Sequence, residues 1–155
     1  MRVYATTKKS AYNRPLIDSH IASEEKAKLF DVDTYKKFMT KIVKDKNSFL
    51  ATLYSLKKRG KRIAAVGAGA RSNTLLNFYR LDNTAIEFVT DASKHKIGKF
   101  TPGSNIEIKD DNALYTEKIN VALITAWNIG KYLTQKIRKI NAKISFIVPG
   151  EKELM

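Results

Sequence analysis

The sequence predicts a three-layer α/β/α fold with a mainly parallel sheet, preceded by an N-terminal arm and a long helix. Short, almost uninterrupted apolar runs such as residues 62–66 and 119–125 are typical of parallel strands buried on both faces. These runs alternate with segments of helical periodicity, and 155 residues are enough for one compact domain. We therefore expect residues 1–22 to form the arm, starting with a short strand, and residues 23–155 to form a single domain.

The first half of this domain is expected to be helical. A short helix is predicted over residues 23–30 and a long leading helix over residues 31–59, capped by Asp31 or Asp33 and ended by Gly60. An apolar stripe recurs along the long helix at helical spacing, and we expect it to face the core. The stripe consists of Tyr35, Phe38, Ile42, Phe49, Leu53 and Leu56.

The second half alternates between strands and helices. The expected strands cover residues 62–66, 85–90, 105–108, 119–125 and 143–148. Helices are expected over residues 73–81 and 129–140, with Asn128 as the cap of the second, and a basic loop over residues 94–104. Because crossover connections are right-handed, we expect the strand order 3-2-1-4-5 of a Rossmann-like domain.

Composition and charge exclude several classes of protein. The net charge of +14 indicates an anionic partner, although the lysines are spread along the chain as on a solvated surface. The chain has no cysteine, which excludes disulfides and cysteine-based zinc sites, and His95 lacks a second histidine at metal-ligand spacing. No apolar run reaches the ~20 residues of a membrane span, and no apolar leader follows Met1. We therefore expect a cytoplasmic protein with no bound metal and no membrane partner.

Ligands of open α/β sheets bind beyond the carboxyl ends of the strands, where the strand order reverses, and three segments are expected to meet there. The first is GAGARS over residues 67–72, where glycines allow close approach and the helix N-terminus favours phosphate. Arg71 adds a cation that can grip a phosphate with two donors. Asp91, at the end of the second strand, can accept hydrogen bonds from ribose or sugar hydroxyls. The alternative is that Gly67 and Gly69 serve only the packing of strand on helix.

The second segment is the basic loop, where Lys96 and Lys99 are expected to screen a diphosphate, and the third follows the fourth strand. It contains the single tryptophan, Trp127, for which core packing is the alternative. No Ser/His/acid set is recognisable, so we expect no catalytic residue in this chain. The candidate substrate-binding residues are Gly67, Gly69, Arg71, Ser72, Asn73, Asp91, Lys96, Lys99, Ser104, Asn105, Trp127 and Asn128.

These segments resemble the C-terminal domain of nucleotide-sugar C-methyltransferases, which depend on S-adenosylmethionine. Residues 64–78 resemble the family's GYGA-x-AKGNTLLNY stretch, and residues 91–108 resemble its D-x-x-P-x-K-x-G-K-Y-T-P-G-T-H-I-P-I segment. Residues 126–128 resemble its AWN and residues 146–149 its closing FIVP. Asn105 stands where the family pattern has histidine, which removes a proton carrier or sugar contact. The resemblance covers nearly the whole chain, and four motifs in the same order are specific.

The resemblance implies a part in the methylation of a carbon next to the keto group of a nucleotide-linked deoxysugar. The chain is then expected to bind a nucleotide diphosphate sugar and to position it for a methyltransferase partner chain or a missing domain. The family's zinc-binding and S-adenosylmethionine domains are absent from this sequence, so we expect no cofactor in this chain. Whether the chain counts as part of a transferase stays open.

Three other interpretations remain. A regulatory Rossmann domain that binds NAD or coenzyme A is the alternative function, because the same glycine loop suits both ligands. A homodimer formed through the N-terminal arm is left open, because an unpaired strand seeks a partner edge. Nucleic acid is the least favoured partner, because no stacking aromatics or helix-turn-helix pattern accompany the charge.

Overall fold

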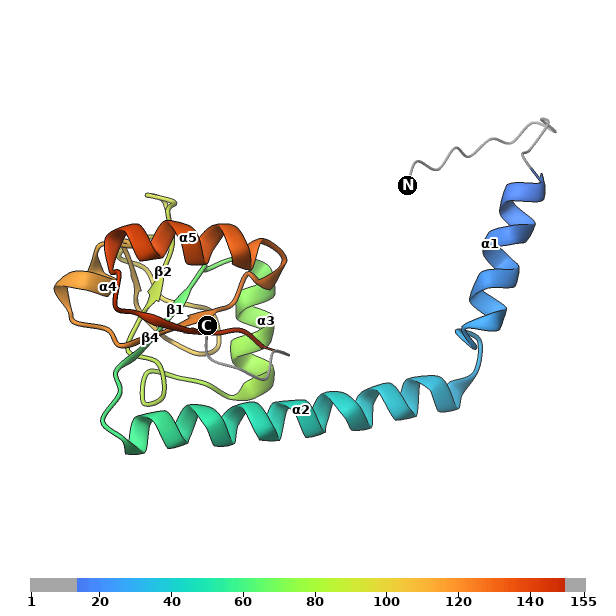
Figure 1. Ribbon diagram of the computed structural model, residues 1–155, viewed down its shortest axis with the longest axis horizontal. Helices are drawn as coiled ribbons and strands as arrows, with labels where there is room; N and C mark the ends of the chain where they lie inside the picture. The colour runs from blue at the N-terminus through green and yellow to red at the C-terminus, as the bar shows by residue number, and fades with distance from the viewer. Residues whose placement is uncertain (1–13, 150–155) are drawn as a thin grey trace. The chain divides into compact units, whose positions relative to one another are not determined.

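The computed structural model describes residues 14–149, and the strand predicted at the start of the arm lies outside them (Figure 1). The chain divides into two compact units, one up to Lys44 and one from Asp45 onward. Helix α1 covers Arg14–Lys26. The short helix predicted over residues 23–30 therefore begins earlier, inside the predicted arm, and ends at Lys26 rather than at residue 30. The sequence did not indicate the early start, because α1 is only weakly amphipathic. The division into an arm and a single domain stays a prediction.

Helix α2 covers Val32–Lys58 and confirms the long leading helix. Of the two candidate caps, Asp31 is the one that acts: its Oδ1 accepts a hydrogen bond from the backbone N–H of Asp33 at 2.9 Å. Gly60 ends the helix with φ +74°, and its N–H donates to the carbonyl oxygen of Lys57 at 2.8 Å. A glycine tolerates this left-handed conformation without strain, so the predicted stop is confirmed.

Only the C-terminal part of the apolar stripe of α2 is buried. Leu53 and Leu56 lie in the core and Phe49 packs against it, whereas Tyr35 and Phe38 are 53% and 56% exposed. The expectation that the whole stripe faces the core is therefore wrong for Tyr35 and Phe38. A 27-residue helix is about 40 Å long, more than a small sheet can cover. Among residues 14–149, neither this helix nor a shorter one is long and apolar enough to cross a bilayer.

The sheet confirms the predicted topology. All of its strand pairs are parallel, and the order is β3-β2-β1-β4-β5. The strands are β1 (Ile63–Val66), β2 (Val89–Thr90), β3 (Ile108–Lys109), β4 (Val121–Ile124) and β5 (Ser145–Ile147). Each strand is shorter than predicted, and β3 overlaps the predicted residues 105–108 only at Ile108 and extends past them to Lys109. Flanking residues such as Ile86 and Phe88 are buried in the core without belonging to a strand.

Three α-helices and one 3₁₀-helix connect the strands. They are α3 (Ala70–Tyr79), α4 (Ala113–Thr116), η1 (Trp127–Ile129) and α5 (Gly130–Ile140). Helix α3 begins at Ala70 rather than at the predicted Asn73. Asn128 lies within η1, and no side chain caps α5, so the prediction that Asn128 caps this helix is wrong. Helix α4 was not predicted, because four residues are too few to show periodicity.

Two apolar clusters, one on each face of the sheet, confirm the three-layer architecture. Alternate residues of β1 point to opposite faces. Ala65 lies in the cluster that includes Leu53 of α2 and Leu76 of α3. Ala64 lies in the cluster that includes Ile137 of α5. Helices on both faces of a parallel sheet make this an α/β fold of the Rossmann-like type.

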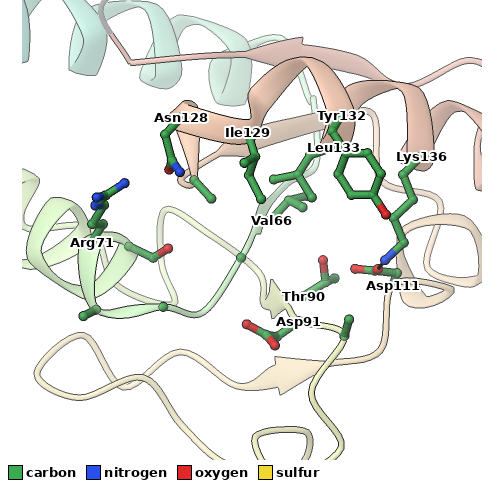
Figure 2. A pocket seen from close by; sticks show the side chains of 16 residues that line it. Val66, Arg71, Thr90, Asp91, Asp111, Asn128, Ile129, Tyr132, Leu133 and Lys136 are labelled. Atoms are coloured by element: carbon green, nitrogen blue, oxygen red, sulfur yellow. Dashed lines mark hydrogen bonds and ion pairs between the residues drawn. The ribbon is translucent and has the colours of Figure 1, made fainter. Parts of the chain in front are cut away.

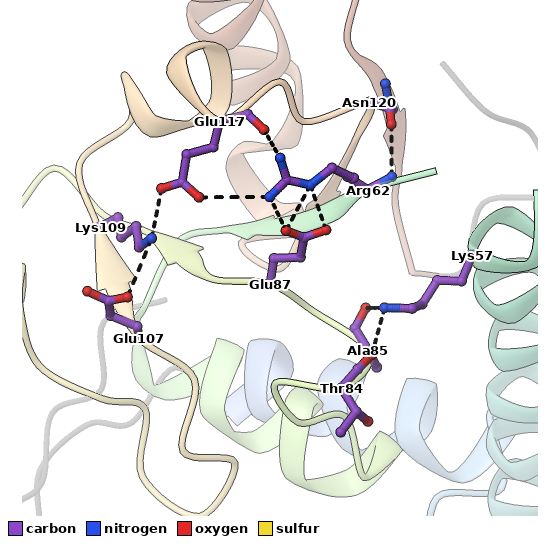
Figure 3. Close-up of polar contacts among 9 residues, drawn as sticks. All are labelled: Lys57, Arg62, Thr84, Ala85, Glu87, Glu107, Lys109, Glu117 and Asn120. Carbon is purple, nitrogen blue, oxygen red and sulfur yellow. Dashed lines mark hydrogen bonds and ion pairs between the residues drawn. The ribbon is translucent and has the colours of Figure 1, made fainter. Parts of the chain in front are cut away.

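A polar network occupies the amino ends of the strands, the edge opposite to the carboxyl ends (Figure 3). The Nε of Arg62 donates to Oε1 of Glu87 at 2.9 Å, and Oδ1 of Asn120 accepts from the backbone N–H of Arg62 at 2.8 Å. The hydrogen bond from Arg62 lowers the pKa of Glu87 in spite of its partial burial. Lys109 donates to Glu117 at 2.7 Å. Part of the chain's positive charge is thus paired here, away from the carboxyl ends of the strands, where the ligand site is expected.

Candidate functional site

A pocket of about 510 Å³ lies at the carboxyl ends of β1 and β2 and next to the residues that follow β4 (Figure 2). Sites for small molecules typically have volumes of ~300–1,000 Å³. β1 and β4 are neighbours in the sheet, while the chain leaves β1 toward β2 on the other side. The pocket therefore lies where the strand order reverses, at the place expected of a ligand site in such a sheet.

The structure brings half of the candidate residues to this pocket. Those that line it are Gly67, Gly69, Arg71, Ser72, Asp91 and Asn128. Those that lie outside the lining are Asn73, Lys96, Lys99, Ser104, Asn105 and Trp127. The segments after β1, β2 and β4 thus contribute to one site, whereas the loop with Lys99 does not.

The residues outside the lining have other surroundings. The Ser104 hydroxyl lies 2.7 Å from the hydroxyl of Thr101, and both residues are buried within the loop. Asn105 is exposed and has φ +51°. Trp127 is 45% exposed, so core packing is wrong for it. The side-chain oxygen Oδ1 of Asn73 is buried and has no hydrogen-bond partner among the residues that the structure describes.

The two glycines of the turn differ in backbone conformation and in the space around them. Gly67 has φ +100°, a left-handed conformation in which a side chain would be strained, whereas a Cβ there would make only ordinary contacts of 3.4 Å with Ala126 Cβ and Thr125 Oγ1. Gly69 has φ −88°, which any residue adopts, and a Cβ there would have no atom within 4 Å. Backbone conformation therefore accounts for Gly67, whereas neither conformation nor a neighbouring atom accounts for a glycine at position 69. Open space above Gly69 is what a ligand close to the backbone requires.

The N-terminus of α3 faces this open space without a cap. No side chain accepts a hydrogen bond from its first amides, so Ala70, Arg71 and Ser72 have N–H groups without an intrahelical acceptor. The guanidinium of Arg71 is exposed and makes no hydrogen bond or ion pair within residues 14–149. Figure 2 shows Arg71 on the same side of the pocket as Asn128. Free amides, a helix dipole and an unpaired guanidinium together suit a phosphate group.

The side chain of Thr125 stabilises the turn that contains Gly67 and Gly69. Its Oγ1 lies 2.7 Å from the carbonyl oxygen of Val66 and 2.8 Å from that of Gly67, and shares its hydroxyl hydrogen between them. The Ser72 hydroxyl donates to the same Oγ1 at 2.8 Å. Both hydroxyls are buried. Ser72 therefore links α3 to the residue that follows β4.

The carboxylate of Asp91 stabilises the same turn. Its carboxylate accepts hydrogen bonds from the N–H of Ala68, the N–H of Ser93 and the ammonium of Lys96, each at 2.9 Å. Burial raises the pKa of Asp91, but the bonds from Lys96, Ser93 and Ala68 outweigh burial and hold the pKa below its usual value. A carboxylate offers about four acceptor positions, so most are already used. Lys96 is paired with Asp91 rather than free to screen a diphosphate.

The low pKa of Asp91 predicts an acid-labile part of the stability. A carboxyl group whose pKa is lower in the folded state stabilises the protein fully above its unfolded pKa of about 4, and this stability disappears as the pH falls through the folded-state pKa. We expect Asp91→Asn to lower the melting temperature at pH 7, and the difference from wild type to shrink below about pH 4. Thermal denaturation followed by circular dichroism between neutral and acid pH measures it. A difference that is independent of pH would contradict this role of the carboxylate.

Sequence reasoning missed four polar residues that line the pocket: Thr90, Asp111, Tyr132 and Lys136. Lys136 donates to Asp111 at 2.5 Å, and this hydrogen bond raises the pKa of Lys136 against the opposing effect of burial. Thr90 ends β2 and Asp111 closely follows β3, so the rule that found Asp91 at a strand's carboxyl end could have found both. Tyr132 and Lys136 are four residues apart on α5 and share one face.

The lining offers hydrogen-bond donors and acceptors rather than a set for proton transfer. It contains no histidine, and Asp91 and Asp111 are each paired with a lysine. Within residues 14–149, no three His, Asp or Glu side chains gather where they could hold a metal ion. Amides, hydroxyls and a guanidinium are suited to holding the phosphate and hydroxyl groups of a ligand.

A family model described as the C-methyltransferase C-terminal domain matches residues 1–149. Among solved structures, the crystal structure of RSP, a Rex-family repressor, is similar with a TM-score of 0.42 and 17% sequence identity. That similarity covers 96% of this chain and 84% of the other. A search of curated proteins finds no significant match.

Proposed function

The chain belongs to the C-methyltransferase C-terminal domain family, and on this basis we propose that it binds a nucleotide diphosphate sugar and positions it for C-methylation. The observation that carries the proposal is the open space over Gly69, bordered by the uncapped N-terminus of α3 and the unpaired guanidinium of Arg71. A diphosphate brings two negative groups to this place. The amides of residues 70–72 and Arg71 would bind them without any rearrangement of a paired side chain.

Positioning is the contribution that this reaction needs from such a pocket. Methylation at a carbon next to a ketone requires that a proton leave that carbon while the sugar is held in a defined geometry. The two carboxylates of the pocket hold lysines, and Asp91 also holds the glycine turn. Membership of the family implies that a separate methyltransferase domain removes the proton, and the pairing of these carboxylates agrees with that assignment. That domain would bind S-adenosylmethionine, from which the methyl group would come.

The rim of the pocket suits contact with that domain. Ile129 and Tyr132 line the pocket and are 47% and 63% exposed, and Trp127 beside them is 45% exposed. Large apolar side chains grouped on a surface are typical of places that another protein surface covers. In the proposal, the methyltransferase domain packs against this rim and closes the mouth of the pocket over the sugar.

Titration with nucleotide sugars tests the proposal. We expect UDP-glucose or dTDP-glucose, as probes of the ligand class, to bind at or below millimolar concentration, measured by calorimetry and by fluorescence of Trp127, the single tryptophan. Absence of binding, both alone and with a cognate methyltransferase, would contradict the proposal. NAD and coenzyme A are run in parallel by thermal shift, and a response to either without one to nucleotide sugars would favour a regulatory dinucleotide-binding function.

Gly69→Ala separates ligand binding from folding. The φ of −88° suits alanine and its Cβ would meet no atom, so we expect an unchanged or slightly raised melting temperature. The added methyl group occupies the space where the phosphate would approach the backbone, so we expect affinity for the nucleotide sugar to fall about tenfold or more. Calorimetry and thermal denaturation of the same preparation measure the two effects. An unchanged affinity would show that the ligand does not approach Gly69.

A further inference from the structure

The hydroxyl of Thr90 is an unexplained group in the wall of the pocket. Thr90 is fully buried, and its Oγ1 has no hydrogen-bond partner among residues 14–149. Buried hydroxyls are nearly always paired, because leaving one unpaired costs free energy. Thr90 lines the pocket, and Figure 2 shows its hydroxyl directed into the space in front of α5. A polar atom of a bound molecule would supply the partner that the protein lacks.

The walls around Thr90 are apolar. Val66, Ile129 and Leu133 line the pocket above it, as Figure 2 shows. A flat ring can pack its face and its edge against these aliphatic side chains. A hexose would be a poor fit here, because its hydroxyl groups would face aliphatic carbon and lose their hydrogen bonds to water.

The far end of the same space is polar. Asp111 is buried and accepts a hydrogen bond from Lys136 through Oδ2, whereas its Oδ1 has no partner among the described residues. Together with Thr90, this end offers a hydroxyl, a free carboxylate oxygen and an ammonium. The edge of a heterocyclic base carries N–H donors and carbonyl or ring-nitrogen acceptors, which these groups complement.

The two ends of the pocket therefore differ in chemistry. Figure 2 shows Arg71 and Asn128 at one side and Asp111 and Lys136 at the other. We infer that the pocket takes a nucleoside diphosphate base-first, with the base between α5 and Thr90, the diphosphate at the N-terminus of α3, and the sugar directed outward. This inference rests on the proposed function and adds the orientation of the ligand. An outward sugar is also the one that a second domain can reach.

The orientation is tested with complete nucleotide sugars and with ligands that contain only one part of them. The full chain is titrated by calorimetry with UDP, dTDP and ADP, with the corresponding glucose conjugates, and with glucose 1-phosphate. For the nucleotide that binds most tightly, we expect the diphosphate and its glucose conjugate to agree within about threefold, since the sugar adds few contacts. Glucose 1-phosphate, which lacks the base, is expected to bind at least about tenfold more weakly.

Thr90→Val removes the hydroxyl and keeps the shape of the side chain. We expect it to weaken the diphosphate and its glucose conjugate equally, by about five- to tenfold, while Thr90→Ser restores most of the affinity. A hydroxyl with only a structural role would lower the melting temperature on removal, whereas we expect that of Thr90→Val to stay the same or rise. This comparison also shows that the variant is folded.

Two results would overturn the inference and leave the proposed function standing. One is glucose 1-phosphate binding as tightly as the nucleotide sugar. The other is a loss in Thr90→Val that affects only the glucose conjugate, which would place the sugar at Thr90. If no ligand of the panel binds the wild-type chain, either alone or with a cognate methyltransferase, both the orientation and the proposed function fail.

Discussion

Replacing Arg71 by alanine is expected to weaken nucleoside diphosphate binding about 10- to 100-fold, which corresponds to about 1.5–3 kcal/mol for hydrogen bonds to a charged group. The guanidinium has no partner among the described residues and lines the pocket beside the uncapped amides of α3. It is therefore free to make two parallel hydrogen bonds to one phosphate. Because the side chain is exposed, its removal should not change the melting temperature measurably.

Three variants serve as controls in the same calorimetric titration. Arg71→Lys keeps the charge but loses the planar fork, so we expect an intermediate loss. Arg59→Ala removes the same charge from the exposed end of α2, and we expect affinity within about threefold of wild type. Lys99→Ala should also stay within about threefold, because Lys99 does not line the pocket. A larger effect at Lys99 than at Arg71 would place the diphosphate on the basic loop and contradict the site described above.

Replacing Leu53 by alanine is expected to lower the free energy of unfolding by about 2–5 kcal/mol, the range for a large-to-small change in a packed core. Leu53 is fully buried although it lies on a helix that precedes the whole sheet in sequence. It belongs to the cluster that contains Ile63 of β1 and Leu76 of α3. The large loss would show that the C-terminal part of α2 is a layer of the fold rather than a linker.

The neighbouring tyrosine provides a matched control. Tyr54 lies on the same turn of α2 and is 50% exposed, so Tyr54→Ala should cost no more than about 0.5–1 kcal/mol. Both variants are compared with wild type by urea denaturation, followed by circular dichroism and by the fluorescence of Trp127. Equal losses at the two positions would contradict the packing of this helix segment on the sheet.

The order of the strands could be predicted because each strand is recognisable from its own short stretch of sequence. Residues 62–66 and 119–125 are almost uninterrupted apolar runs of strand length, and the right-handed rule for crossovers leaves few ways to arrange them. The same local reasoning misplaced Tyr35 and Phe38. Periodicity shows that one face of α2 is apolar, but it does not show how much of that face a small sheet covers.

The loop after β2 contains four of the six candidate site residues that lie outside the pocket lining, and its contacts show why. Asn77 of α3 donates to the carbonyl oxygen of Pro102 at 3.0 Å, and the N–H of Gly98 donates to Ile108 at 2.8 Å. These contacts fold the loop back onto α3 and β3. They hold Lys99 and Ser104 outside the lining of the pocket. The contacts join residues far apart in sequence, and no local pattern in the loop indicates them.

The α/β class, the order of the strands and the turn with Gly67 and Gly69 follow from residue type and spacing within short segments of the chain. Which polar groups face the pocket does not follow from any such segment. Asp91 and Asp111 are each paired with a lysine, while Arg71 and the hydroxyl of Thr90 are left without a partner among the described residues. Pairing and burial depend on distances between separate elements, and the folded chain alone sets those distances.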